Sequence, residues 1–234
     1  MKKVFFCLLV CMTCTLSAQE AYWTNYYMVV EPQNVGTFYK LTNDYFTANK
    51  TEGVTVTLYE NHFNDPGNNF THSIGFSGSL DALGNMYAKD GGAAWELFLV
   101  KLNQHIKEGY GSRMGTRKSH MGDLSQDYPI QKYFIVHADN GPMWDSAYNA
   151  YFKANTPAGM LNMMGNFTAG ASSDGENRWV INGFKDFKSA IGGANHLRSD
   201  AQKAANDKAW QKFLEDNGES HLVRSGLRVR MGQW

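Results

Sequence analysis

The chain has 234 residues, of which 43% are hydrophobic and 19% charged, and its 22 basic and 22 acidic residues leave no net charge at pH 7. Because there is also no long basic run, the charge pattern argues against a nucleic-acid partner and against attachment to an anionic membrane. The length suits one large domain or two small ones, each with a proper hydrophobic core.

The first 18 residues have the pattern of a secretory signal peptide. Lys2 and Lys3 precede an apolar run, which ends at the small residues Ser17 and Ala18. This run is too short for a permanent membrane helix, so we expect cleavage after Ala18. The mature chain, residues 19–234, is therefore predicted to be exported to the periplasm or the extracellular space, without membrane insertion.

The cysteines all fall in the segment that is predicted to be removed, at Cys7, Cys11 and Cys14. The mature chain then has no disulfide and no thiolate metal ligand, so its stability must come from its core. Loss of Lys2 and Lys3 leaves 20 basic against 22 acidic residues, a net charge near −2.

The next hundred residues alternate between strand and helix patterns. Strands are indicated by β-branched and aromatic runs, and helices by apolar residues at helical spacing. We expect strands at Tyr26–Val30, Val54–His62, Phe70–Phe76 and Tyr110–Met114, a helix from Glu31 to Asn49, a short helical segment at Leu80–Ala88, and an amphipathic helix whose apolar stripe runs from Trp95 to Ile106.

The second half of the chain repeats this order. We expect strands at Lys132–Val136, Met160–Phe167, Arg178–Phe184 and Leu222–Met231, a helix from Asn140 to Asn155, a short helical segment at Phe187–Ile191, and a helix carrying Trp210, Phe213 and Leu214. Asn49 and Asn155 end the two equivalent helices, and asparagine tolerates the left-handed conformation common at that position.

Five short matches in the same order indicate a duplication of the whole chain. The pairs are Tyr26–Val30 with Lys132–Val136, Asp44–Asn49 with Ala150–Asn155, Ile74–Phe76 with Asn182–Phe184, Ala94–Leu99 with Ala209–Leu214, and Ser112–Gly115 with Val229–Gly232. A generic helix or strand pattern explains one match but not five in one order. We therefore predict two repeats, residues 19–125 and residues 126–234.

The element order of each repeat, β-α-β-β-α-β, predicts an α+β fold of two tandem ferredoxin-like units. Such a sheet has helices on one face only, so we expect the two sheets to pack face to face within one chain as an intrachain α/β barrel. In this order and duplication the chain resembles the dimeric α+β barrel superfamily, which includes antibiotic-biosynthesis-type monooxygenases, NIPSNAP-like proteins and the haem-binding chlorite-dismutase group. The resemblance implies a pocket for a small, often aromatic or apolar, molecule.

The first hairpin holds the densest group of chemically active side chains, Glu60, His62 and His72. Alternation places Glu60 and His62 on one face of the strand, and the hairpin sets His72 nearly opposite Glu60. Two imidazoles and a carboxylate could bind zinc or iron, or act as an acid-base pair. A hydrated hairpin end with ordinary polar side chains explains the same pattern.

Other candidates occupy matched strand positions. Glu31 and His137 both follow a first strand, and Arg113 and Arg230 lie in the matched fourth strands. The two arginines could hold a carboxylate through paired hydrogen bonds, or could be solvated at the rim of the barrel. Neither late helix offers a proximal histidine for haem, and no cofactor or metal is identified by the sequence.

Three functions stay open on these grounds. The first is an exported protein that binds a small apolar or aromatic ligand in the barrel, with Glu31, Glu60, Arg113 and Arg230 as candidate ligand-binding residues. The second is a cofactor-independent oxygenase or related enzyme with His62, His72 or His137 as base. The third is a structural or accessory role. The sequence does not determine whether the protein forms a homo-oligomer.

Overall fold

The computed structural model describes residues 21–234, so the predicted signal peptide, residues 1–18, lies outside the described residues. The first half of this part contains β1 (Ala21–Val30), the 3-10 turn η1 (Pro32–Asn34), α1 (Val35–Ala48), β2 (Val54–Asn64), β3 (His72–Gly78), α2 (Leu80–Ala88), α3 (Gly92–Asn103) and β4 (Ile106–Met121). No helix within residues 21–234 is long and apolar enough to cross a membrane.

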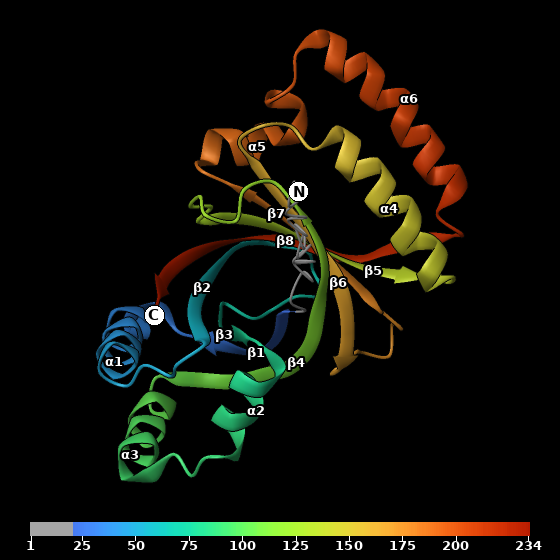
Figure 1. Ribbon diagram of the computed structural model, residues 1–234. Helices are drawn as coiled ribbons and strands as arrows, with labels where there is room; N and C mark the ends of the chain where they lie inside the picture. The colour runs from blue at the N-terminus through green and yellow to red at the C-terminus, as the bar shows by residue number, and fades with distance from the viewer. Residues whose placement is uncertain (1–20) are drawn as a thin grey trace, which may run out of the picture.

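The second half has the same order of strands and helices. It contains β5 (Ile130–Ala138), α4 (Gly141–Asn155), β6 (Met160–Ala169), β7 (Arg178–Phe184), α5 (Phe187–His196), α6 (Asp200–Asp216) and β8 (Ser220–Gln233). In Figure 1, α1, α2 and α3 lie on one side of the strands, and α4, α5 and α6 lie on the opposite side.

The eight strands close into one antiparallel barrel, in the order β1-β3-β2-β8-β5-β7-β6-β4. Each half supplies a ferredoxin-like sheet of four neighbouring strands, and the pairs β2–β8 and β4–β6 join the two sheets. Closure removes the free sheet edges that a single half would expose. The predicted α+β fold, with two repeats packed as an intrachain barrel, is confirmed.

Alternation along the strands gives the barrel an outer and an inner core. Along β2, Val54, Val56 and Leu58 are buried in the cluster that contains Phe38 of α1. The intervening side chains point into the barrel, where Phe70, Tyr133, Ile135, Trp179 and Ile181 form a separate buried cluster. Because both faces of the sheet are covered, hydrophobicity alone does not distinguish the inner face from the outer one.

The two asparagines end their helices in a different way from the one predicted. The backbone φ of Asn49 is −123°, so this residue is not left-handed. Its side-chain Nδ2 donates to the Tyr45 carbonyl oxygen at 2.8 Å, and Asn155 Nδ2 donates to the Tyr151 carbonyl oxygen at 2.7 Å. Each side chain thus satisfies one of the carbonyls that a helix end leaves without a partner.

The strand β4 is much longer than predicted. It begins at Ile106, which the sequence analysis assigned to the preceding helix, and it runs to Met121. This segment contains glycines and charged residues and lacks a regular apolar alternation, which is why only Tyr110–Met114 was predicted as strand.

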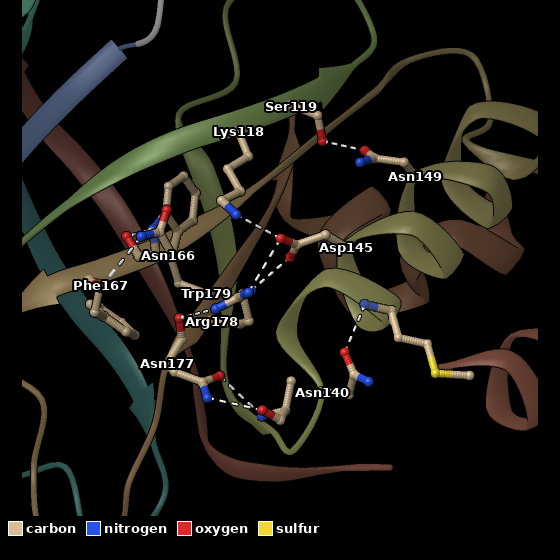
Figure 2. A network of polar contacts seen from close by, with 12 residues as sticks. Lys118, Ser119, Asn140, Asp145, Asn149, Asn166, Phe167, Asn177, Arg178 and Trp179 are labelled. Carbon is tan, nitrogen blue, oxygen red and sulfur yellow. Dashed lines mark hydrogen bonds and ion pairs between the residues drawn. The ribbon is translucent and has the colours of Figure 1, made fainter. Parts of the chain in front are cut away.

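A polar network holds α4 of the second half against β4 of the first half. Figure 2 shows the carboxylate of Asp145 in α4 facing two cations: its Oδ2 accepts from Lys118 Nζ at 2.7 Å, and its Oδ1 accepts from Arg178 Nε at 2.7 Å. One turn later, Asn149 accepts from the Ser119 hydroxyl at 2.5 Å. Arg178 is only 9% exposed, so this ion pair is well shielded from solvent.

Candidate functional site

The barrel encloses a cavity of about 520 Å³ between its two sheets. Aromatic rings from both halves line it, among them Trp23, Tyr27, Phe70, Phe167 and Trp179. The volume lies within the usual range for small-molecule pockets. The cavity is therefore the natural place to look for a binding site, and it lies inside the barrel rather than between a sheet and its helices.

One wall of the cavity is built where β4 meets β6. The ring of Trp23 meets those of Trp179 and Phe167 edge to face, with centroids 5.7 Å and 5.8 Å apart. Glycine is required beneath two of these rings, because a Cβ at Gly115 would overlap Trp23 and one at Gly165 would overlap Trp179. The glycines thus let the indoles lie flat along the neighbouring strands.

Three buried polar atoms of the lining residues lack a hydrogen-bond partner within residues 21–234. They are the donors Nε1 of Trp23 and Nε of Arg224, and the acceptor Oδ1 of Asn25. Asn25 as a whole is 6% exposed. A buried polar group without a hydrogen bond destabilises a fold, so this lining carries a cost in stability that a purely structural core would avoid.

Tyr133 anchors a satisfied polar network on another side of the cavity. Its hydroxyl accepts from Asn68 Nδ2 at 2.9 Å and donates to Asn61 Oδ1 at 3.2 Å. Burial raises the pKa of Tyr133, although these hydrogen bonds oppose the shift. At neutral pH the phenol is therefore protonated, and it serves as a positioning group rather than a base.

Within residues 21–234, the charged residues that line the cavity are four arginines, namely Arg113, Arg117, Arg224 and Arg228. Two of them have carboxylate partners in the loop between β6 and β7: Arg113 Nη2 lies 2.8 Å from Oε1 of the buried Glu176, and Arg224 pairs with Asp174. The contact at Glu176 Oε1 is an ion pair without hydrogen-bond geometry, while Oε2 accepts from Ser172 at 2.6 Å.

Glu176 remains a carboxylate despite its burial. Desolvation alone would raise the pKa of Glu176, but hydrogen bonds around Ser172 and the positive charge of Arg113 outweigh it, so the pKa is lowered. The loop that carries Glu176 is thus tied by charge to one end of the barrel.

The other two arginines have no carboxylate partner among the residues that the structure describes. Arg228 donates from Nε and Nη2 to Gln131 Oε1, at 3.1 Å and 2.9 Å, and its guanidinium lies 3.9 Å from the centroid of the Tyr59 ring. The guanidinium of Arg117 makes neither a hydrogen bond nor an ion pair with any residue in the described part of the chain. Partial burial lowers the pKa of Arg117.

Solved structures of three proteins share this architecture. A protein named as a putative monooxygenase from Fusobacterium nucleatum is 14% identical, with a TM-score of 0.57 over 91% of this chain and 93% of that one. Another so named, from Lactobacillus acidophilus, is 12% identical, with a TM-score of 0.57 over 92% and 95%. An anthrone oxidase-like protein is 14% identical, with a TM-score of 0.52 over 92% and 93%.

The chain has the dimeric α+β barrel fold. Identities this low show the fold and not an activity. No protein-family model matches the sequence, and no curated protein has a similar sequence. Within the dimeric α+β barrel, the chemistry must therefore be argued from the residues themselves.

The predicted cluster of the first hairpin lies on the outside of the barrel. Glu60 and His72 are paired across β2 and β3, and His62 Nε2 lies 3.1 Å from Glu60 Oε2. His72, which is 1% exposed, packs against Phe38 of α1 with ring centroids 5.5 Å apart. The side chains share a face as predicted, but only His72 is buried, while Glu60 and His62 are partly exposed to solvent. No metal-binding group of three or more His, Cys, Asp or Glu occurs within residues 21–234.

His137 and Glu31 also lie away from the cavity lining. His137 Nδ1 is 2.5 Å from the Gly175 carbonyl oxygen, its Nε2 is 3.0 Å from Asp139, and its ring stacks on His221 at 5.0 Å. Glu31 accepts from Gln33 Nε2 at 2.7 Å and lies 3.6 Å from Lys107 Nζ. Both residues are held by neighbours at the ends of strands.

The strand register changes the predicted pairing of the two arginines. Arg113 in β4 is paired with Asn25 in β1. The residue of β5 that corresponds to Asn25 in the second repeat is Gln131, and Gln131 is paired with Arg228 in β8. Arg228, and not Arg230, is therefore the equivalent of Arg113. Arg230 pairs with Asp127 and does not line the cavity. The predicted match was thus displaced by two residues along β8. A displacement of two leaves the matched side chain on the same face of the strand, so the alternation pattern does not reveal it.

Arg117 and Arg228 were not predicted as site residues. Each lies an even number of residues from a predicted one, because Arg117 is four residues after Arg113 and Arg228 is two residues before Arg230. That periodicity was the available signal for a charged inner face.

His72 should titrate at a lower pH than a solvent-exposed histidine. Burial is the main cause that lowers its pKa, the charge of Glu60 opposes this, and the charge of His62 adds to it. We therefore expect Glu60→Gln to lower the pKa of His72 further, as measured by NMR of the imidazole across a pH series. Titration of His72 at an ordinary pH, unchanged in the variant, would contradict its placement beneath α1.

Proposed function

We propose that this protein is exported and binds a small aromatic or apolar molecule inside the barrel cavity. The observation that carries the proposal is the cavity itself, a space of about 520 Å³ with an aromatic wall and with a few polar groups in its lining, among them Tyr133 and Arg117. Apolar walls with a few convergent polar groups are typical of sites that bind small molecules in a defined orientation. Export is supported by the signal-peptide pattern of residues 1–18.

The proposal is tested by native mass spectrometry of the mature chain, residues 19–234. We expect an added small-molecule mass that is released on collisional activation. The variant Thr57→Phe should lose it, because Thr57 lines the cavity and is 7% exposed, so a larger side chain there occupies the ligand's space. Leu97→Phe is the matched control, since Leu97 is 55% exposed on α3. A bound mass that persists in Thr57→Phe would place the ligand elsewhere.

A second candidate, a cofactor-independent oxygenase, is favoured by the names of the similar structures, two monooxygenases and an anthrone oxidase-like protein. Against it, none of the histidines in residues 21–234 lines the cavity, so the predicted bases His62, His72 and His137 do not lie beside a ligand bound there. Oxygen uptake with anthrone separates the two. The binding proposal predicts no uptake above the protein-free rate, whereas uptake abolished by Thr57→Phe would favour the enzyme.

A further inference from the structure

We propose that the molecule bound in the cavity is an aromatic anion, such as a carboxylate, and that Arg117 is the residue that binds its charged group. This inference rests on the binding function proposed above and adds the charge and the orientation of the ligand. It differs from the sequence prediction, which assigned an anion to Arg113 or Arg230.

The charge inside the barrel supports an anion. The four arginines of the lining carry positive charge, and no aspartate or glutamate within residues 21–234 is part of that lining. Glu176 and Asp174, which lie just outside, neutralise Arg113 and Arg224. Two positive charges, on Arg117 and Arg228, are left without a carboxylate in the described part of the chain. A cavity with uncompensated positive charge attracts an anion, because its low-dielectric walls focus the electric field into the space.

Arg117 is the better of these two candidates. Arg228 already donates two hydrogen bonds to Gln131 and lies over the Tyr59 ring, so its guanidinium is held in place by the protein. No residue within 21–234 accepts a hydrogen bond from Arg117, so its donors are available to a ligand. Because a guanidinium offers two parallel N–H groups, it matches the two oxygens of a carboxylate.

The position of Arg117 explains why the anion should be aromatic. Its partner across the β4–β6 pair is Gly165, the glycine over which the Trp179 ring lies. On the same strand, Gly115 lies beneath Trp23, two residues before Arg117. The guanidinium therefore extends from the strand beside the aromatic wall, so a flat ring can pack on the indoles while its charged group meets Arg117.

The cost of keeping Arg117 unpaired points in the same direction. An arginine that is partly buried without a counter-ion destabilises a fold, and natural proteins keep such groups where they have a use. The charge of Arg117 reaches His120, whose pKa is lowered first by burial and then by Arg117. No carboxylate on the neighbouring strands β1 and β6 offsets it, because neither strand contains one.

The test is isothermal titration calorimetry of residues 19–234 with two matched probes, 1-naphthoate and its neutral isostere 1-naphthamide. A pH of 8 keeps His120 neutral, since its pKa is lowered. We expect naphthoate to bind about tenfold to a hundredfold more tightly than naphthamide, the effect of a charge-assisted hydrogen bond in a shielded site. Arg117→Gln should abolish this preference without weakening naphthamide binding, and Arg117→Lys should restore part of it.

Arg230→Gln is the matched control, because Arg230 pairs with Asp127 outside the cavity lining, and it should leave the preference unchanged. A thermal melt without ligand checks the fold, and Arg117→Gln should melt no lower than the wild type. Equal binding of the two probes would overturn the anion inference and leave the binding function standing. Binding of neither probe would count against both. A preference that survives in Arg117→Gln but is lost in Arg113→Gln would reassign the charged group to Arg113.

Discussion

Replacing Glu176 with glutamine should lower the free energy of unfolding by about 3–5 kcal/mol, the typical cost of breaking a buried ion pair from one side. Glu176 is 1% exposed and its carboxylate lies 2.8 Å from Arg113. In the variant, Arg113 keeps a charge in a shielded position, between the rings of Tyr27 and Phe167, with no carboxylate to offset it. Urea denaturation followed by circular dichroism measures the loss.

Asp174→Asn is the matched control from the same loop. Asp174 also pairs with an arginine of the lining, Arg224, but its side chain is 49% exposed, so water can replace the lost partner. We expect a much smaller effect on stability than in Glu176→Gln. Replacing Arg113 and Glu176 together by methionine should destabilise less than Glu176→Gln alone, because no unpaired charge remains. Equal effects of Glu176→Gln and Asp174→Asn would contradict the shielding of the Glu176 pair.

The contribution of Glu176 should also depend on pH with a defined sign. The pKa of Glu176 is lowered on folding from its ordinary value of 4.5. A lowered carboxyl pKa stabilises the folded state above the unfolded pKa, and this stabilisation is lost as the pH falls through the folded one. The stability difference between wild type and Glu176→Gln should therefore shrink below about pH 4.5.

The repeat made much of the fold predictable. The matched segments ending at Asn49 and Asn155 and the matched strands at Tyr26–Val30 and Lys132–Val136 were sufficient for the order of elements and for a barrel closed within one chain. These features follow from local patterns that both copies carry. Helix and strand periodicity depend on neighbouring residues, so they can be read without knowledge of distant contacts.

The site was harder to predict because both faces of each strand are covered. The alternation of side chains along the strands correctly placed Glu60 and His72 on one face of the hairpin. That face, however, also carries Leu58, which packs on α1. In an open sheet the polar face would be the solvated face, whereas here the inner face holds Asn25 and Arg117 around the cavity. Which face points inward depends on the closure of the barrel, and closure is a long-range property that no local pattern records.

Gly165→Ala should be the most damaging change in the aromatic wall. The added Cβ would overlap both the Thr116 carbonyl oxygen and the Trp179 indole. The carbonyl cannot retreat without disturbing the β4–β6 pairing that joins the two halves of the barrel. We expect a loss of about 3 kcal/mol in the free energy of unfolding, the upper end of the usual cost of overpacking.

The same variant should also weaken binding of 1-naphthamide, since a displaced Trp179 ring no longer forms the wall against which an aromatic ligand packs. Gly109→Ala is the matched control in β4, because nothing lies within 4 Å of a Cβ at that position. Urea denaturation and calorimetric titration of the two variants, side by side, separate a general response to an added methyl group from the specific contact with Trp179. If Gly165→Ala were as mild as Gly109→Ala in both measurements, the indole could not lie over Gly165, and the ligand would have to be sought along another wall of the barrel.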